Sequence, residues 1–399
     1  MTVIEDLSIR KIIDSRGNPT VEVDVFTVNG FGSAAAPSGA SVGTHEVSSF
    51  PKNGVDTAIS FFKKSVIPKL VGKDASEQRD IDATLHEIDG TENFSKIGGN
   101  VAVAVSIAVA KAAANTFYLP LYQYIGGVFA SKIPKPLGNV LGGGKHAIGG
   151  PDIQEFLVTT FAPINEAVFG NAEVHKKVKE ELKHGFPGAA IGRGDEGAWV
   201  AHLGNEEALD IVSYSCKSVS DRTGLEIRPS LDFAASEFYK DGKYRYKDKM
   251  LDTEGQINFV AELVDKHGLY LVEDPLNEND FDGFAKLTEL IGDRCIVVGD
   301  DLFVTNKKRL EKGIKMGACN SILIKPNQIG TLTETFETVS LAHSNGYVPV
   351  MSHRSGETAD DAIAHLAVGL GCPIIKTGVV GGERTAKLNE LIRIGEENG

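Results

Sequence analysis

The chain is poor in features that mark several specialised protein classes. Its four cysteines, Cys216, Cys295, Cys319 and Cys372, have no CxxC spacing, which predicts isolated buried thiols rather than a disulfide framework or a zinc site. Its longest apolar stretch, 101–110, is too short to span a bilayer. We find no low-complexity segment, no close repeat and no P-loop motif.

Positive charge is also in deficit. There are 41 lysines and arginines against 54 aspartates and glutamates, a net charge of −13, which disfavours binding to nucleic acid or to an anionic membrane. An anionic small substrate still fits if a pocket gathers cations or a metal. The N-terminal stretch MTVIEDLSIRK carries Glu5 and Asp6 and lacks the apolar core of a secretory signal, so we expect a cytoplasmic protein.

The N-terminal third reads as strands followed by helices. Alternating VEVDVF from Val21, an Asn29-Gly30 turn signal and a strand of small residues predict β-structure up to about residue 36. A Gly/Ser-rich loop at 37–43 follows, and then helical patterns at 75–89 and 100–117. The second of these is Ala-rich enough to be a helix buried in a bundle. We therefore expect a small α+β domain over residues 1–130.

The remaining chain reads as repeated βα units. A change of composition at 126–138 predicts a linker, and from about residue 136 onward apolar strands alternate with amphipathic helices. The later helices are expected at 281–291, 306–317, 331–346 and 360–371. This alternation predicts a parallel sheet, and the number of units favours a closed β/α barrel over residues 131–399.

Ionisable residues recur at the ends of the expected strands. LYLV precedes Glu273, IVVG precedes Asp300, ILI precedes Lys325, VPVM precedes the segment 352–354, and PII precedes Lys376. From Glu273 to Asp300, Lys325, His353 and Lys376 the intervals are 27, 25, 28 and 23 residues, about one βα unit each. Upstream, IRPSL precedes Asp232 and AAIGRG precedes Asp195 and Glu196. In a β/α barrel such residues converge on one face, where chemistry occurs.

Three of these residues suit a hard metal ion. Asp232, Glu273 and Asp300 would supply carboxylate oxygens, the ligands that Mg²⁺ prefers, and would leave positions for water and substrate. The alternative is that acids at strand-to-helix loops cap the following helices. Three acids in consecutive units favour the metal site.

The cationic residues suit a base and an anion site. Lys325 lies in SILIKPN, and burial, a metal and a second cation would lower its pKa so that it could act as a base. The alternative is a lysine whose ammonium reaches solvent from a strand end. Arg354, Ser355 and Lys376 together suit a phosphate, although Arg354 alone would more simply form a salt bridge.

Three further motifs are weaker on their own. The loop SGASVG at 38–43 could bind an anion through its backbone amides, or it is a flexible connection. His146 follows LGGGK, where a lone histidine is more often structural than catalytic. Asp195 and Glu196 stand between glycines and could approach a ligand closely or form an ordinary turn.

Taken together, the motifs resemble one family, the enolases. The matching strings run in family order over nearly the whole chain: DSRGNPTVEV (14–23), SGAS followed by HE (38–46), KH with IQEF (145–156), GDEG (194–197), SLDFAASEF (230–238), VEDP (272–275), GDDLFVTN (299–306), ILIKPNQIGTLTET (322–335), SHRSGET (352–358), and IKTG followed by RTAKLNELIRI (375–394). Each is modest alone, and the set is highly specific.

The resemblance implies a fold and a reaction. The fold would be α/β, with a small α+β N-terminal domain and an enolase-type (β/α)8 barrel that opens ββαα. The reaction would be the reversible dehydration of 2-phosphoglycerate to phosphoenolpyruvate in glycolysis and gluconeogenesis, with two Mg²⁺ ions per active site. Members are homodimers or octamers, and no nucleic-acid partner or membrane span is implied.

The resemblance also implies a role for each matching residue. Lys325 would remove the C2 proton, and Glu196 would protonate the departing C3 hydroxyl. The first Mg²⁺ would be held by Asp232, Glu273 and Asp300, and Ser41 would help to hold the second. The substrate contacts and their neighbours would be His146, Gln154, Glu155, Lys325, His353, Arg354, Ser355 and Lys376.

The chain departs from the family pattern in three places. VSSFPK follows His45-Glu46 where a charged continuation is usual, and AWVAHL follows GDEG in place of a glycine, aromatic and Ala-Pro pattern. The chain is also short at several points, and its trimmed tail and GGERTAK are typical of an archaeal-type branch. Two alternatives stay open, namely another enolase-superfamily acid-sugar lyase and a non-catalytic binding protein derived from an enolase.

Overall fold

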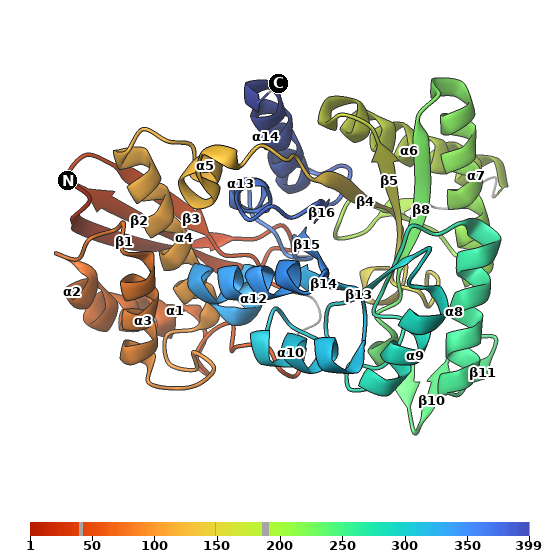
Figure 1. Cartoon of the computed structure of the whole chain (residues 1–399), viewed down its shortest axis with the longest axis horizontal. Coiled ribbons are helices and arrows are strands. Elements are labelled where there is room, and N and C mark those ends of the chain that lie inside the picture. The colour runs from red at the N-terminus through yellow and green to blue at the C-terminus, as the bar shows by residue number, and fades with distance from the viewer. Residues whose placement is uncertain (40–42, 148, 186–190, 399) are drawn as a thin grey trace.

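The computed structural model describes residues 1–39, 43–147, 149–185 and 191–398. Figure 1 shows the N-terminal elements gathered on one side of the molecule, in red to orange, and a barrel with its outer helices on the other. The small domain and the barrel expected from the sequence are both present.

The N-terminal part is built on a three-stranded antiparallel sheet. Its strands are β1 (Ile4–Ile13), β2 (Pro19–Thr27) and β3 (Phe31–Ala35), in the order β1-β2-β3. The β2–β3 hairpin turns at Asn29-Gly30, as the sequence predicts. The helical elements that follow are α1 (Val55–Phe61), η1 (Phe62–Val66), α2 (Ile67–Leu70), α3 (Gln78–Asp89), α4 (Gly99–Thr116), α5 (Leu121–Gly126) and η2 (Gly127–Phe129).

Helix α4 is the core of this part. It is buried on nearly all sides, but it packs on β2 and β3 with α3 as a further neighbour, so the predicted bundle is wrong. The close approach depends on Gly32, where an added Cβ would lie 2.1 Å from the Ala108 carbonyl oxygen. Small residues therefore let the helix lie directly on the sheet, a pattern that helical periodicity alone does not distinguish from a bundle.

The barrel is a closed ring of eight strands. Around the ring the order is β16-β15-β14-β13-β12-β8-β5-β4, and β16 pairs with β4 to close it. The strands are β4 (Lys135–Gly142), β5 (Glu155–Phe161), β8 (Glu226–Asp232), β12 (Leu271–Glu273), β13 (Ile296–Gly299), β14 (Ser321–Ile324), β15 (Val348–Ser352) and β16 (Ile374–Lys376). Strand β5 runs antiparallel to both neighbours, and the other pairs are parallel, which is the ββαα opening implied by the resemblance.

Helices surround the ring. They are α6 (Ile164–Gly185), α7 (Asn205–Thr223), α8 (Thr253–His267), α9 (Phe281–Ile291), α10 (Lys307–Met316), α11 (Pro326–Ile329), α12 (Leu332–Ser344), α13 (Ala362–Gly369) and α14 (Gly382–Asn398). The later helices fall where the sequence predicts them because Asp280, Asn306 and Thr331 cap α9, α10 and α12 with their side chains. The part also has a hairpin of β6 (Gly192–Arg193) with β7 (Trp199–Val200), and a three-stranded antiparallel sheet of β9 (Tyr239–Lys240), β10 (Lys243–Arg245) and β11 (Met250–Leu251).

The connection between the two parts is shorter than predicted. Strand β4 begins at Lys135, inside the 126–138 segment expected to be a linker. Pro136 pairs with Ile375 at the seam of the ring. The domain boundary near residue 130 stays a prediction.

Apolar side chains close the interior of the barrel below the site. One buried cluster takes a residue from seven of the eight strands, Leu137, Leu157, Leu271, Val298, Leu323, Val350 and Ile374. The polar residues two or three positions further along the parallel strands therefore lie above an apolar layer. The four cysteines are free, buried thiols, as predicted.

Among the described residues, no single helix is long and apolar enough to cross a membrane. Helix α4 and the segment 121–129 together have the length and composition of a membrane span, but the two are bent by 95° relative to each other.

Candidate active site

The predicted site residues line one pocket at one end of the barrel. Strands β8, β12, β13, β14, β15 and β16 contribute from their carboxyl ends, where Glu273 pairs with Asp232 and Ser352 pairs with Lys376. Because β5 is reversed, its first residue, Glu155, lies opposite Asp232 at the same end. The pocket lining includes His146, Gln154, Glu155, Glu196, Asp232, Asp300, Lys325, His353, Arg354, Ser355 and Lys376. Glu273 is not part of this lining but accepts a hydrogen bond from Lys376, which is. Ser41 lies outside the described residues.

Lys376 stands at the centre of three carboxylates. Its Nζ lies 2.6 Å from Glu273 Oε2, 3.0 Å from Asp232 Oδ2 and 3.3 Å from Glu155 Oε2. Burial alone would lower the pKa of Lys376, but the three carboxylates raise it well above its usual value. Burial raises the pKa of Glu273, and the neighbouring Asp232 raises it further. Burial and the neighbouring Glu196 likewise raise the pKa of Glu155 well above its usual value, so one ammonium does not satisfy all three acids.

A second ion pair joins Asp300 to Lys325. Lys325 Nζ donates to Asp300 Oδ2, and Gln328 Nε2 donates to the other carboxylate oxygen at 3.1 Å. Burial lowers the pKa of Lys325, but the contact with Asp300 opposes burial, and the net effect is a raised pKa. The sequence predicted a lowered pKa, because it gave no sign that this lysine would contact Asp300. In this structure Lys325 is therefore an ammonium.

Two further acids, Asp274 after β12 and Asp301 after β13, lie beside Asp300 and were not singled out from the sequence. Asp274 accepts the backbone N–H of Asp300 at 2.9 Å and that of Asp301 at 2.8 Å. Burial and the adjacent Asp300 raise the pKa of Asp301 to about 7. Both acids follow a predicted ligand directly, in VEDP and GDDLF, which is the signal that could have identified them.

The residues present fit a divalent cation. Among the described residues, two groups have carboxylate or imidazole atoms all within 4.8 Å of one another, His146/Glu155/Glu196 and Asp274/Asp300/Asp301. The predicted ligands Asp232, Glu273 and Asp300 do not form such a group, since Lys376 bridges the first two and Lys325 pairs with the third. The buried acids of the pocket outnumber the lysines that pair with them. They therefore offer the oxygen donors and the negative charge that a divalent cation requires.

Arg354 is held by a residue from the N-terminal part. Its Nη1 and Nη2 each donate to Glu46 at 3.0 Å, and Nη1 also donates to Asn327 Oδ1 at 2.9 Å. Both charged side chains are buried. Glu46 belongs to the HE string quoted above, but nothing in the sequence indicated its partner, 308 residues away.

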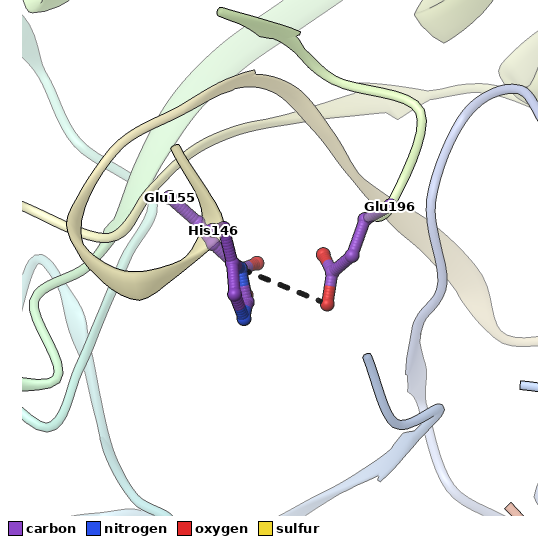
Figure 2. Close-up of side chains that lie close together, drawn as sticks. All are labelled: His146, Glu155 and Glu196. Carbon is purple, nitrogen blue, oxygen red and sulfur yellow. Dashed lines mark ion pairs between the residues drawn. The ribbon is translucent and has the colours of Figure 1, made fainter. Parts of the chain in front are cut away.

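Glu196 faces two histidines. Figure 2 shows the Glu196 carboxylate directed towards His146, which comes from a different segment, with Glu155 beside it. The nearest Glu196 oxygen, Oε1, lies 4.0 Å from His146 Nδ1 and 3.4 Å from His353 Nε2, while Oε2 accepts from Asn139 Nδ2 at 3.1 Å. All of these side chains are buried.

The protonation states of Glu196 and its two histidines depend on one another. Burial lowers the pKa of His353 to about 4, so this histidine is neutral at pH 7. Burial raises the pKa of Glu196, whereas His353 and His146 lower it, with a net direction well below the usual range. Arg384 also lowers it, whereas a neutral His353 removes part of the lowering and leaves burial as the influence that favours the protonated form of Glu196.

The departures from the family pattern lie outside the pocket. Trp199 Nε1 donates to the His175 carbonyl oxygen at 2.8 Å, and its ring stacks on His175, so it packs against α6. Val47 N donates to the Gln328 carbonyl oxygen at 3.0 Å, which anchors the altered 47–52 segment beside Glu46.

Comparisons with known proteins agree with this arrangement. Residues 4–125 match the family model "Enolase, N-terminal domain", and residues 130–399 match "Enolase, C-terminal TIM barrel domain". A protein named enolase from Methanothermobacter thermautotrophicus is 57% identical, over 99% of this chain and 97% of its own. Enolases from Natronomonas pharaonis and Picrophilus torridus are 53% and 48% identical, again over 99% of this chain, and over 99% and 98% of their own. This chain, with its N-terminal sheet domain and its ββαα barrel, therefore belongs to the enolase family.

Proposed function

We propose that this protein catalyses the Mg²⁺-dependent, reversible dehydration of 2-phosphoglycerate to phosphoenolpyruvate. The observation that carries the proposal is the convergence of Lys325, Glu196 and Arg354 with an excess of buried carboxylates on one pocket. The names and full-length similarity of the relatives support the same reaction. The reaction removes a proton from C2 and a hydroxyl from C3, so it needs a base, an acid and stabilisation of charge on the substrate carboxylate.

Lys325 is the base in this proposal. It takes the C2 proton, and the electron pair of the broken C–H bond moves towards the C1 carboxylate. To do so it must first be neutral, whereas its pairing with Asp300 keeps it charged. When bound by Asp232, Glu273 and Asp300, Mg²⁺ would stabilise the added negative charge and compete with Lys325 for Asp300. A second Mg²⁺ would involve Ser41.

Glu196 is the acid. The C2–C3 double bond forms as the C3–O bond breaks, and the Glu196 proton joins the departing hydroxide to give water. Asn139 and His353 lie beside the two oxygens of the carboxylate that remains. Burial favours the protonated form that the step requires, against His353, His146 and Arg384, which lower the pKa of Glu196.

The charged side chains left over suit the substrate anions. Arg354, with Ser355 beside it, would bind the phosphate, and Lys376 would bind the substrate carboxylate among its three acids. His146, Gln154, Glu155 and His353 complete the lining. We further propose a domain boundary at 130/131, a cytoplasmic location, and a homodimer or octamer.

The experiment is an assay of ultraviolet absorbance from phosphoenolpyruvate after 2-phosphoglycerate is added, with Mg²⁺ and with EDTA. We expect product that depends on Mg²⁺ and disappears with EDTA. Folded protein that binds Mg²⁺ but forms no product would refute the proposal and favour another acid-sugar substrate or a binding role.

A further inference from the structure

Arg384, at the start of α14, is a buried cation next to the proposed acid but outside the set of substrate contacts. Its side chain has no exposed surface. Its Nη1 contacts His353 Nδ1 at 2.7 Å and donates to the Arg354 carbonyl oxygen at 2.6 Å. Its Nη2 donates to the carbonyl oxygens of Ser355 at 2.7 Å and Asp195 at 3.2 Å.

The contact with His353 has only one chemical reading. A guanidinium donates hydrogen bonds and has no acceptor, so His353 Nδ1 must accept. A neutral imidazole with Nδ1 as acceptor carries its hydrogen on Nε2. That Nε2 is the atom 3.4 Å from Glu196 Oε1. Arg384 therefore determines which form of His353 faces the proposed acid.

The tautomer matters for Glu196. With hydrogen on Nε2, His353 has no lone pair to take the Glu196 proton, and it can donate towards the carboxylate left after that proton is given away. With hydrogen on Nδ1 instead, a bare Nε2 would compete for the same proton. We infer that Arg384 is a positioning residue that holds His353 in the Nε2–H form, so that His353 offers no acceptor for the Glu196 proton and can donate to the carboxylate left after the proton has gone to the substrate hydroxyl.

The same side chain also joins the two loops that form this contact. It binds backbone oxygens on both sides of the pair, at Asp195, next to Glu196, and at 354–355, next to His353. The charged groups around His353 are Arg384, Glu196 and Glu357, and His146 is on the other side of Glu196. The inference deepens the proposed function and rests on the role proposed there for Glu196.

The test uses the full chain with ¹⁵N-labelled histidine. The signals of His353 among the 10 histidines are identified with His353→Gln, and its tautomer is read from the ring nitrogen shifts between pH 6 and 8. Wild type should show hydrogen on Nε2 only. Arg384→Met should convert His353 to the Nδ1–H form or to the charged ring. Arg384→Lys, which also only donates, should keep the wild-type tautomer.

Lys387→Met is the matched control. Lys387 lies one turn further along α14, is equally buried, and binds Glu357 Oε2 at 2.8 Å and the Thr358 carbonyl oxygen at 2.6 Å without touching His353. It should lose stability and leave the His353 signals unchanged.

Two rates complete the experiment, exchange of the C2 proton with solvent and formation of phosphoenolpyruvate. In Arg384→Met we expect dehydration to fall at least tenfold more than exchange, and in Lys387→Met we expect the two rates to change in parallel. Hydrogen on Nδ1 in wild type, or an unchanged tautomer in Arg384→Met, would overturn the inference. If Arg384→Met does not fold, loss of the Nε2–H form in Arg384→Lys would overturn it. An inactive wild type with the expected tautomer would refute the proposed function but not the positioning.

Discussion

The pair of Glu46 and Arg354 gives the sharpest prediction of stability. Glu46→Gln removes one charge and little volume from a pair whose side chains are 3% and 4% exposed. Breaking a buried ion pair by removing one partner costs about 3–5 kcal/mol, because the other charge stays buried. The amide still offers one acceptor oxygen, and Asn327 still accepts from Arg354, so we expect the lower end, about 3 kcal/mol.

This loss converts into a shift of the unfolding temperature. An unfolding entropy of about 2.1 cal/mol/K per residue gives about 0.8 kcal/mol/K for 399 residues. A loss of about 3 kcal/mol then lowers the midpoint by about 4 °C. Thermal unfolding followed by circular dichroism, in metal-free buffer at one protein concentration, measures this shift.

Glu337→Gln is the control for the same chemical change at the surface. Glu337 pairs with Arg79 at 3.0 Å and Lys307 at 3.4 Å, but its side chain is 36% exposed. Exposed pairs contribute less than about 1 kcal/mol, so its midpoint should fall by about 1 °C or less. Equal shifts in the two variants would contradict this prediction, because the two glutamates are expected to differ only through the burial of their ion pairs.

Other predictions follow from the site and from one buried histidine. Lys325→Ala should lower turnover by at least about 10³-fold with unchanged circular dichroism, and wild-type-like activity would remove Lys325 as the base. Glu196→Gln should keep C2 proton exchange while phosphoenolpyruvate formation is lost; a parallel fall of both rates would contradict the acid role. Burial lowers the pKa of His175 from 6.5 to about 4, so below pH 6.5 the unfolded chain takes up a proton that the folded chain resists. Stability should therefore fall by about 3 kcal/mol as the pH drops from 6.5 to 4, and His175→Gln, compared in urea unfolding across that range, should lack this part of the decline.

The sequence predicted the parallel strand ends well because their geometry is periodic. Glu273, Asp300, Lys325 and Lys376 follow apolar runs in a regular series of βα units, Asp232 follows a similar run upstream, and a barrel brings such positions to one face. Glu155 did not follow from that rule, since it begins a reversed strand, and only the resemblance pointed to it.

The sequence did not indicate most of the contacts between side chains that lie far apart along the chain. Glu46 contacts Arg354 from the N-terminal part, and Arg384 contacts His353 from α14, beyond the next helix and strand. Both lie in strings quoted for the family, but a string does not say which atoms it will touch. The raised pKa of Lys325 was missed for the same reason, because Asp300 is its neighbour in space and not along the chain.

The ammonium of Lys376 has a consequence for synthesis on the ribosome. It belongs to β16, the strand that closes the ring, and it follows Glu273 by 103 residues and Asp232 by 144. The acids of the centre therefore emerge long before the cation that neutralises them, and gathering buried, unpaired carboxylates is costly. The strand that closes the ring thus also brings the counterion of the centre, so closure of the barrel and neutralisation of its acids depend on the same segment near the C-terminus.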